Sequence, residues 1–172
     1  NYFKSFKLGL FLSDVYLNHL MAIILSVFLR GYRGKTVDFA LASNSHRTTI
    51  AHFLNDGKWD DDQLKSILKT SIIEIVYSEA RKSGQPVLCI VDDTIASHTK
   101  PSSQAEHPIE AAYFHQYHLK GCQDYGHQAV SVMLSCNGIT LNYAIILYDK
   151  SKSKIQIVQE IAEELPPAPV IS

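Results

Sequence analysis

Cysteine is scarce in this sequence, and the few cysteines follow no disulfide or metal-binding pattern. The 172 residues include Cys89, Cys122 and Cys136, which are odd in number, far apart and never spaced as CxxC. Such a set excludes both a disulfide-stapled secreted domain and a zinc knuckle. We therefore expect a cytoplasmic protein in which the thiols stay reduced.

The sequence also lacks an excess of charge of either sign and a long uninterrupted apolar run. Its formal net charge is -1, and 46% hydrophobic and 19% charged residues are typical of a globular chain. The most apolar stretch, residues 8–31, is interrupted by Asp14, Asn18 and His19. Its uninterrupted part is too short to span a bilayer, so we interpret it as a buried helix and expect no membrane partner.

Helical signals dominate the first half of the chain. Ser13 and Asp14 are typical of a helix start, and apolar residues at helical spacing follow them. We assign 1–84 to a helical module that resembles a helix-turn-helix. The predicted segments are a helix over 13–30, two short helices on either side of 43–45, and a long helix within 59–84.

Strand signals dominate the second half, 85–172. Asn137-Gly138 between two β-rich runs is a strong hairpin signal, and Pro166 ends a helical pattern. The predicted elements are a buried strand over 87–93, a long loop with a short edge strand near 113–118, a hairpin over 127–148, and a helix over 154–165. This order indicates an α+β or α/β domain with a mixed sheet, whose final helix leads to a parallel strand.

Two adjacent acids, Asp92 and Asp93, follow the apolar run of the predicted strand 87–93. An acid at the end of a buried strand is held rigidly and still reaches solvent, which suits a metal ligand. Because strand side chains alternate, the two acids point to opposite faces, and one of them is the working ligand. The alternative is that either acid caps the turn that follows.

Three stretches together resemble insertion-sequence transposases with a DDE catalytic triad on a ribonuclease-H-like fold. They are "VDDT" at 91–94, "YHLKGCQDYGHQAVSV" at 117–132 and "SHRTTIAHFLNDGKWDDDQL" at 45–64. The resemblance covers nearly the whole chain as an amino-terminal portion of such a protein. It implies a helical DNA-contacting module followed by the first half of a ribonuclease-H-like sheet.

The resemblance also implies a site and a reaction. In similar transposases the first catalytic aspartate directly precedes a threonine, which selects Asp93 before Thr94, with Asp92 as the fallback. Asp93 would bind Mg²⁺ or Mn²⁺ together with two acids that lie beyond residue 172. The complete protein would cleave DNA at element ends and transfer the strand to target DNA, whereas this portion alone would be inactive.

The resemblance implies that the protein binds DNA. It is also compatible with a homodimer. Basic side chains that could neutralise phosphates lie near the helix-turn-helix and near the acids. We predict DNA contacts from Arg30, Arg33, Lys35, Arg47, Lys100 and Lys120.

Two other functions stay open from the sequence. One is a non-catalytic DNA-binding remnant or inhibitor derived from a transposase. The other is a metal-dependent hydrolase of a small substrate, in which Asp93 works with histidines that could bind zinc. Those histidines are His98, His107, His115, His118 and His127.

Overall fold

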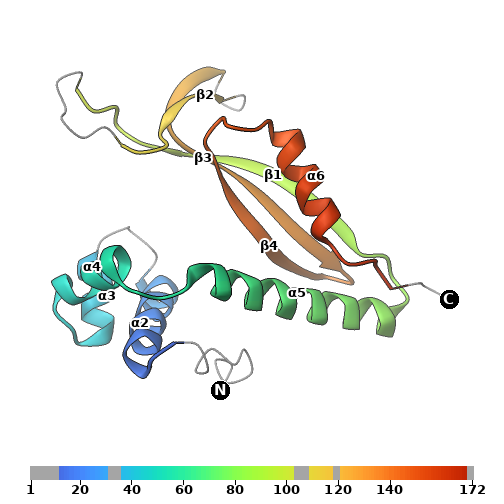
Figure 1. Ribbon diagram of the computed structural model, residues 1–172, viewed down its shortest axis with the longest axis horizontal. Helices are drawn as coiled ribbons and strands as arrows, with labels where there is room; N and C mark the ends of the chain where they lie inside the picture. Colours follow the sequence, from blue (N-terminus) through green and yellow to red (C-terminus); the bar gives the residue numbers. More distant parts are fainter. Residues whose placement is uncertain (1–11, 31–35, 103–108, 118–120, 170–172) are drawn as a thin grey trace. The chain divides into compact units, whose positions relative to one another are not determined.

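A computed structural model of the protein describes residues 12–30, 36–102, 109–117 and 121–169. The chain divides into two compact units, Asn1–Leu68 and Lys69–Ser172. Figure 1 shows helices in the first unit, and helices with an antiparallel sheet in the second. The fold class is mixed α+β, as the sequence predicts.

The first unit is built from helices that begin and end close to their predicted limits. Ser13 caps the first of them, because its Oγ accepts the backbone N–H of Tyr16 at 3.3 Å. The helices are α2 (Asp14–Arg30), α3 (Thr36–Ser43), α4 (Arg47–Asp56) and the first part of α5 (Asp61–Ser83). The helix predicted over 13–30 is confirmed by α2.

A small apolar cluster joins α2, α3 and α4. Phe39 and Ala40 from α3 pack with Ile50 from α4, and Ile23 of α2 packs against them. The turn between α3 and α4 includes Asn44 in the left-handed region at φ 52°. Such a turn lets two short helices meet at an angle, as a helix-turn-helix requires.

The prediction that α2 is a buried helix is only partly right. Ala22 and Ser26 are buried, but the side chains near its end are open, with Phe28 81% and Leu29 77% exposed. The apolar pattern correctly indicated one buried stripe along α2. The opposite side of the helix has no packing partner within the described residues. None of the helices within those residues combines the length and apolar character needed to cross a membrane.

The second unit contains a sheet whose central strand is long. The strands are β1 (Leu88–Ser97), β2 (Tyr113–Tyr117), β3 (Cys122–Cys136) and β4 (Ile139–Tyr148). Because β1 and β4 pair with the same part of β3, they border it on opposite sides, and all pairs are antiparallel. The predicted hairpin is confirmed: Asn137 and Gly138 have φ 47° and 82°, the signature of a tight hairpin turn.

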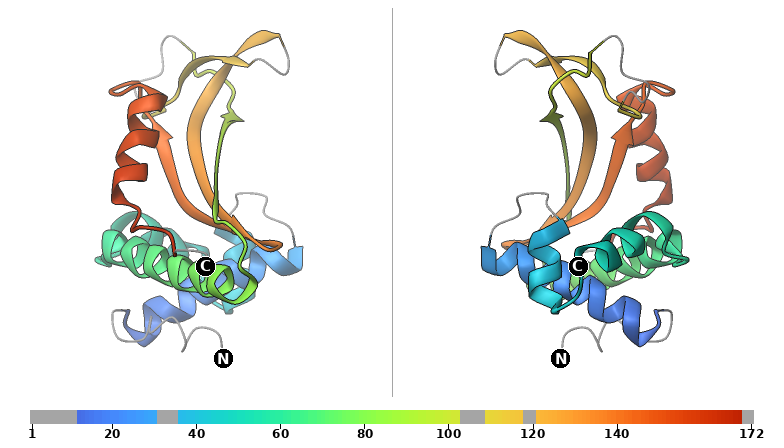
Figure 2. Two further views of the ribbon diagram at one scale, coloured as in Figure 1. Left: turned by 90° about the vertical axis from the view of Figure 1, so that its right-hand side faces the viewer. Right: turned by 90° about the vertical axis from the view of Figure 1, so that its left-hand side faces the viewer.

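One face of the sheet, which we call the covered face, carries the core. Every second residue of β3 from Val130 to Cys136 is buried there. The second half of α5 and the later helix α6 (Lys154–Glu164) pack on this face through Val76 and Ile161. Figure 2 shows α6 alongside the curved sheet. The opposite, open face includes Ile145, which is 69% exposed.

Several strand boundaries predicted for this unit are wrong. The strand predicted over 87–93 continues to Ser97, and β3 begins five residues before the predicted hairpin start, so the loop is shorter. The first strand is also exposed rather than buried, since Ile90 and Val91 are 39% and 43% exposed. The edge strand predicted near 113–118 corresponds to β2, and the parallel strand predicted after α6 lies outside the described residues.

Candidate functional site

Asp92 and Asp93 lie inside β1 rather than at its end, which corrects the prediction from the sequence. Thr94 and Ile95 favour extended backbone, and β3 is long enough to pair with them as well. Asp93 pairs with Val130 and Asp92 with Ser131. Paired residues share a face, so Asp93 lies on the covered face and Asp92 on the open face.

The covered face changes from apolar to polar next to Asp93. Along β3 the buried side chains of Val132 and Val130 are followed by Gln128, which is only 4% exposed. Tyr148 of β4 is paired with Gln128 and therefore lies on the same face. A polar group therefore begins where the apolar core ends, and four strands and a helix contribute to it. We call it the Asp93 cluster, which consists of Asp93, His115, Gln128, Tyr148 and Lys154.

The carboxylate of Asp93 has two partners, the side-chain amide of Gln128 and the ammonium group of Lys154. Gln128 Nε2 donates a 2.8 Å hydrogen bond to Asp93 Oδ2. Lys154, the first residue of α6, forms an ion pair with the same oxygen, and its Nζ lies 5.5 Å from the ring centroid of Tyr148. The side chains of Asp93 and Lys154 are 44% and 39% exposed, so the pair is open to solvent. A carboxylate with an oriented oxygen and access to solvent can bind a cation.

His115, like Gln128, is a buried member of the cluster. It is 5% exposed, and its Nε2 makes no hydrogen bond within the part of the chain that the structure describes. The pKa of His115 lies below its ordinary value of 6.5, first because burial disfavours the charged ring and then because Lys150 is near. The ring therefore favours its neutral form, in which one nitrogen can still accept a proton or a hydrogen bond.

Gly126 explains why β1 and β3 approach so closely beside the cluster. A Cβ on Gly126 would lie 2.1 Å from the carbonyl oxygen of Ala96, which belongs to the backbone of β1. A side chain at this position would push the two strands apart. The "YGHQ" stretch of the sequence thus contains a structural glycine and, two positions later, the amide that holds Asp93.

Of the histidines proposed as zinc ligands, the three that the structure describes do not gather in one place. His98 and His127 contact each other, with Nε2 of His98 2.8 Å from Nδ1 of His127. His127 Nε2 donates to the carbonyl oxygen of Glu110 at 2.8 Å, because a carbonyl oxygen can only accept. This pair is on the open face, away from His115. His107 and His118 lie outside the described residues, which hold no metal-ligating group of three His, Cys, Asp or Glu.

The predicted DNA contacts fall in three places. Arg47 is exposed at the start of α4. Lys100 is exposed near β2, with its Nζ 5.3 Å from the ring centroid of Phe114, whose side chain is on the open face. The side chain of Arg30 and the whole of Arg33, Lys35 and Lys120 lie outside the described residues. Lys100 therefore does not join Asp93, whereas Arg47 is available to a partner of the first unit.

The chemistry of Asp93 fits one ligand of a magnesium or manganese ion. Both polar contacts of Asp93 are to Oδ2, and Oδ1 accepts none from the described residues. Mg²⁺ prefers carboxylate oxygens, keeps several waters and is often held by one or two carboxylates plus substrate phosphates. Asp93 can supply one such oxygen, and the remaining ligands would come from elsewhere.

Sequence reasoning found Asp93 but missed its neighbours. Alternation along β3 places Gln128 on the face of Val130 and Val132, so a lone polar residue on an apolar face was the available signal. For Lys154 the signal was the capping-box pair Ser153 and Gln156, which makes Lys154 the first helical residue. No comparable signal marked His115, because its role depends on the pairing of β2 with β3.

Comparisons with protein-family models, with curated proteins and with solved structures found no match to this chain.

Proposed function

We propose that this chain is the amino-terminal portion of a DDE transposase, an enzyme that cleaves DNA at element ends and transfers the strand to a target. The observation that carries the proposal is the place of Asp93. It lies on the first strand of the sheet, at the point where the covered face becomes polar, and accepts the buried amide of Gln128. The hairpin of β3 and β4 and then α6 follow it, in the order that the family resemblance implies.

In this proposal Gln128 and Asp93 have distinct tasks. Gln128 fixes one carboxylate oxygen of Asp93, which leaves the other directed to a cation. Bound divalent metal would activate the attacking oxygen and stabilise the leaving oxygen. The two further acids of the triad lie beyond these residues, so we expect no cleavage by residues 1–172 alone.

The helical unit supports DNA contact. α3 and α4 are joined by the short turn at 44–46, and the side of α4 away from the cluster at Ile50 is open. This side presents hydrogen-bonding and basic side chains that can reach phosphates or base edges. The exposed residues of α4 are Arg47, Thr48, Thr49, His52, Leu54, Asn55 and Asp56, of which His52 and Asp56 contact each other at 2.8 Å.

The test is a plasmid-nicking assay with the complete product of the gene that encodes this chain, with Mg²⁺ or Mn²⁺. Asp93→Asn should abolish cleavage. Asp92→Asn is the matched control, because Asp92 is adjacent but on the other face, and it should retain cleavage. Loss in the Asp92 variant alone would make Asp92 the catalytic residue, and absence of cleavage by the wild type would reject the enzyme.

A DNA-binding protein that does not cut is the second candidate, favoured by the open side of α4. Fluorescence anisotropy of the 172-residue chain on duplex DNA tests it. Arg47→Ala should weaken binding and lower the slope of log K against log salt by about 0.9 if it neutralises one phosphate. Lys65→Ala is the control, because Lys65 is already paired with Asp61 at 2.7 Å. Equal effects of both substitutions would reject a specific contact by Arg47.

A further inference from the structure

Lys154 lies against the carboxylate that the proposed function assigns to a metal ion. Its ammonium group pairs with Oδ2, the oxygen that also accepts from Gln128. Gln128 is buried and fixed, whereas Lys154 is partly exposed on a flexible four-carbon stem. Gln128 is therefore expected to stay bound to the carboxylate, whereas Lys154 can move away from it.

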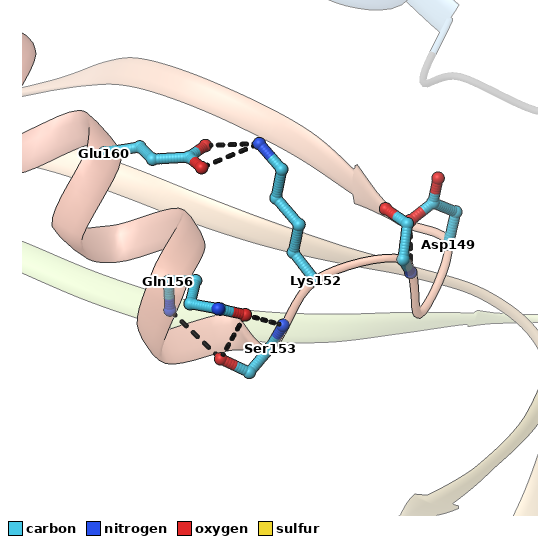
Figure 3. Close-up of polar contacts among 6 residues, drawn as sticks. Asp149, Lys152, Ser153, Gln156 and Glu160 are labelled. Carbon is cyan, nitrogen blue, oxygen red and sulfur yellow. Dashed lines mark hydrogen bonds and ion pairs between the residues drawn. The ribbon is translucent and has the colours of Figure 1, made fainter.

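The position of Lys154 is set by the start of α6. Ser153 Oγ accepts the backbone N–H of Gln156 at 3.2 Å, and Gln156 Oε1 accepts the backbone N–H of Ser153 at 2.9 Å (Figure 3). This reciprocal cap fixes the backbone at the first helical residue. The ring of Tyr148 beside the ammonium further favours a cation here.

Neighbouring lysines are engaged elsewhere. Lys150 Nζ donates to the carbonyl oxygen of Phe114 at 3.1 Å. Lys152 pairs with Glu160 at 2.7 Å, as Figure 3 shows. In the described part of the chain, the ion pair with Asp93 is therefore made by Lys154 and not by the other lysines of this segment.

We propose that Lys154 is a built-in counter-ion that competes with the divalent cation for Asp93. This inference rests on the proposed function, in which Asp93 is a metal ligand. A lysine and a divalent cation cannot share one carboxylate without repulsion between them. When metal binds, the ammonium leaves Oδ2 and Gln128 keeps the carboxylate oriented. The lysine therefore lowers the metal affinity of the site and neutralises Asp93 while no metal is bound.

The test is paramagnetic broadening of backbone amide signals by Mn²⁺, measured by NMR on the 172-residue chain. This method detects weak binding and needs no cleavage. The broadening of the Asp93 and Gln128 amides per unit Mn²⁺ is compared between the wild type and Lys154→Met. Because the pair is partly exposed, we expect broadening that is about twofold to fivefold steeper in the variant. Lys154→Arg keeps the charge and should behave like the wild type.

Lys150→Met is the matched control, because it removes the same charge from the same segment but does not contact Asp93. Lys154→Gln is a second neutral variant in case Lys154→Met does not fold. If the neutral variants broaden no more than the wild type or Lys150→Met, the counter-ion role is wrong even though Asp93 binds metal. If Asp93→Asn broadens like the wild type, or no protein broadens at these amides, Asp93 binds no metal in this chain and the counter-ion proposal fails, whereas the proposed function is decided by the nicking assay with the complete gene product.

Discussion

Gln128, buried in β3, donates a 2.8 Å hydrogen bond to the carboxylate of Asp93 in β1, which lies 35 positions earlier in the chain. An amide can donate to this carboxylate without adding a charge to the sheet. The bond therefore orients Asp93 and leaves its negative charge intact.

Gln128→Glu should destabilise the second unit, because it places a second carboxylate beside Asp93 in a buried position. We expect a loss of about 2 to 4 kcal/mol in the free energy of unfolding at about pH 8. Burial and the like charge raise the pKa of the introduced carboxyl in the folded state. The loss should therefore shrink as the pH falls and this carboxyl becomes protonated. Urea unfolding at several pH values measures it.

Gln128→Met is the control for that prediction, because methionine has a similar volume and no charge. It removes the hydrogen bonds to Asp93 and to His115 and should cost about 1 to 2 kcal/mol, with a smaller change between about pH 5.5 and pH 8 than Gln128→Glu shows. Equal losses for the two variants at every pH would show that packing, rather than charge next to Asp93, decides stability here.

His115 should make the stability of the second unit depend on pH. Its pKa is lowered in the folded state by burial and by Lys150, so the unfolded chain binds the proton more readily. The stabilising contribution is complete above the ordinary value of 6.5 and is lost as the pH falls through the lower folded pKa. Urea unfolding of the wild type and of His115→Gln from about pH 5 to pH 8 isolates this contribution. Parallel pH curves for the two proteins would contradict it.

Gly126→Ala should loosen the pairing of β1 with β3. The added Cβ would lie 2.1 Å from the carbonyl oxygen of Ala96, so the strands must separate. We expect a loss of about 1 to 3 kcal/mol. Hydrogen exchange at the β1 amides should be faster than in Gln123→Ala, a control at an exposed position of the same strand. Unchanged exchange would mean that the backbone accommodates the side chain.

Ser153→Ala should weaken the first turn of α6. The substitution removes the side-chain acceptor for the Gln156 N–H and should cost about 1 kcal/mol. Ser151→Ala is the control, because Ser151 lies outside the helix and donates to Asp149. Thermal unfolding followed by circular dichroism compares the two. A larger effect of the control would show that the loop, and not the cap, determines the helix start.

Local signals in the sequence predicted those parts of the fold that local interactions decide. Asn137-Gly138 specified the hairpin turn, and Ser13 marked the start of α2, because both depend on backbone preferences of a few residues. Exposure was harder to predict. The apolar residues Ile90 and Phe28 were expected to be buried, but whether they meet a partner depends on tertiary arrangement.

The candidate site was predicted only in part, because it too depends on tertiary arrangement. "VDDT" led to Asp93, but the sequence alone did not show that β1 continues past it. Gln128 and His115 join Asp93 only through the registers of β3 with β1 and β2, which bring distant residues to one face. Strand register depends on pairing across the sheet, so it cannot be read from one strand.

The two-residue turn at Asn137-Gly138 also bears on the order in which the second unit folds. A hairpin joined by so short a turn closes within about microseconds, because little chain entropy is lost. The pairing of β1 with β3 must close a much longer loop and should be slower. We therefore expect Asp93 to meet Gln128 after the hairpin has formed. The polar cluster should then form late in folding, and weakening β1 should dismantle it while β3 and β4 stay paired.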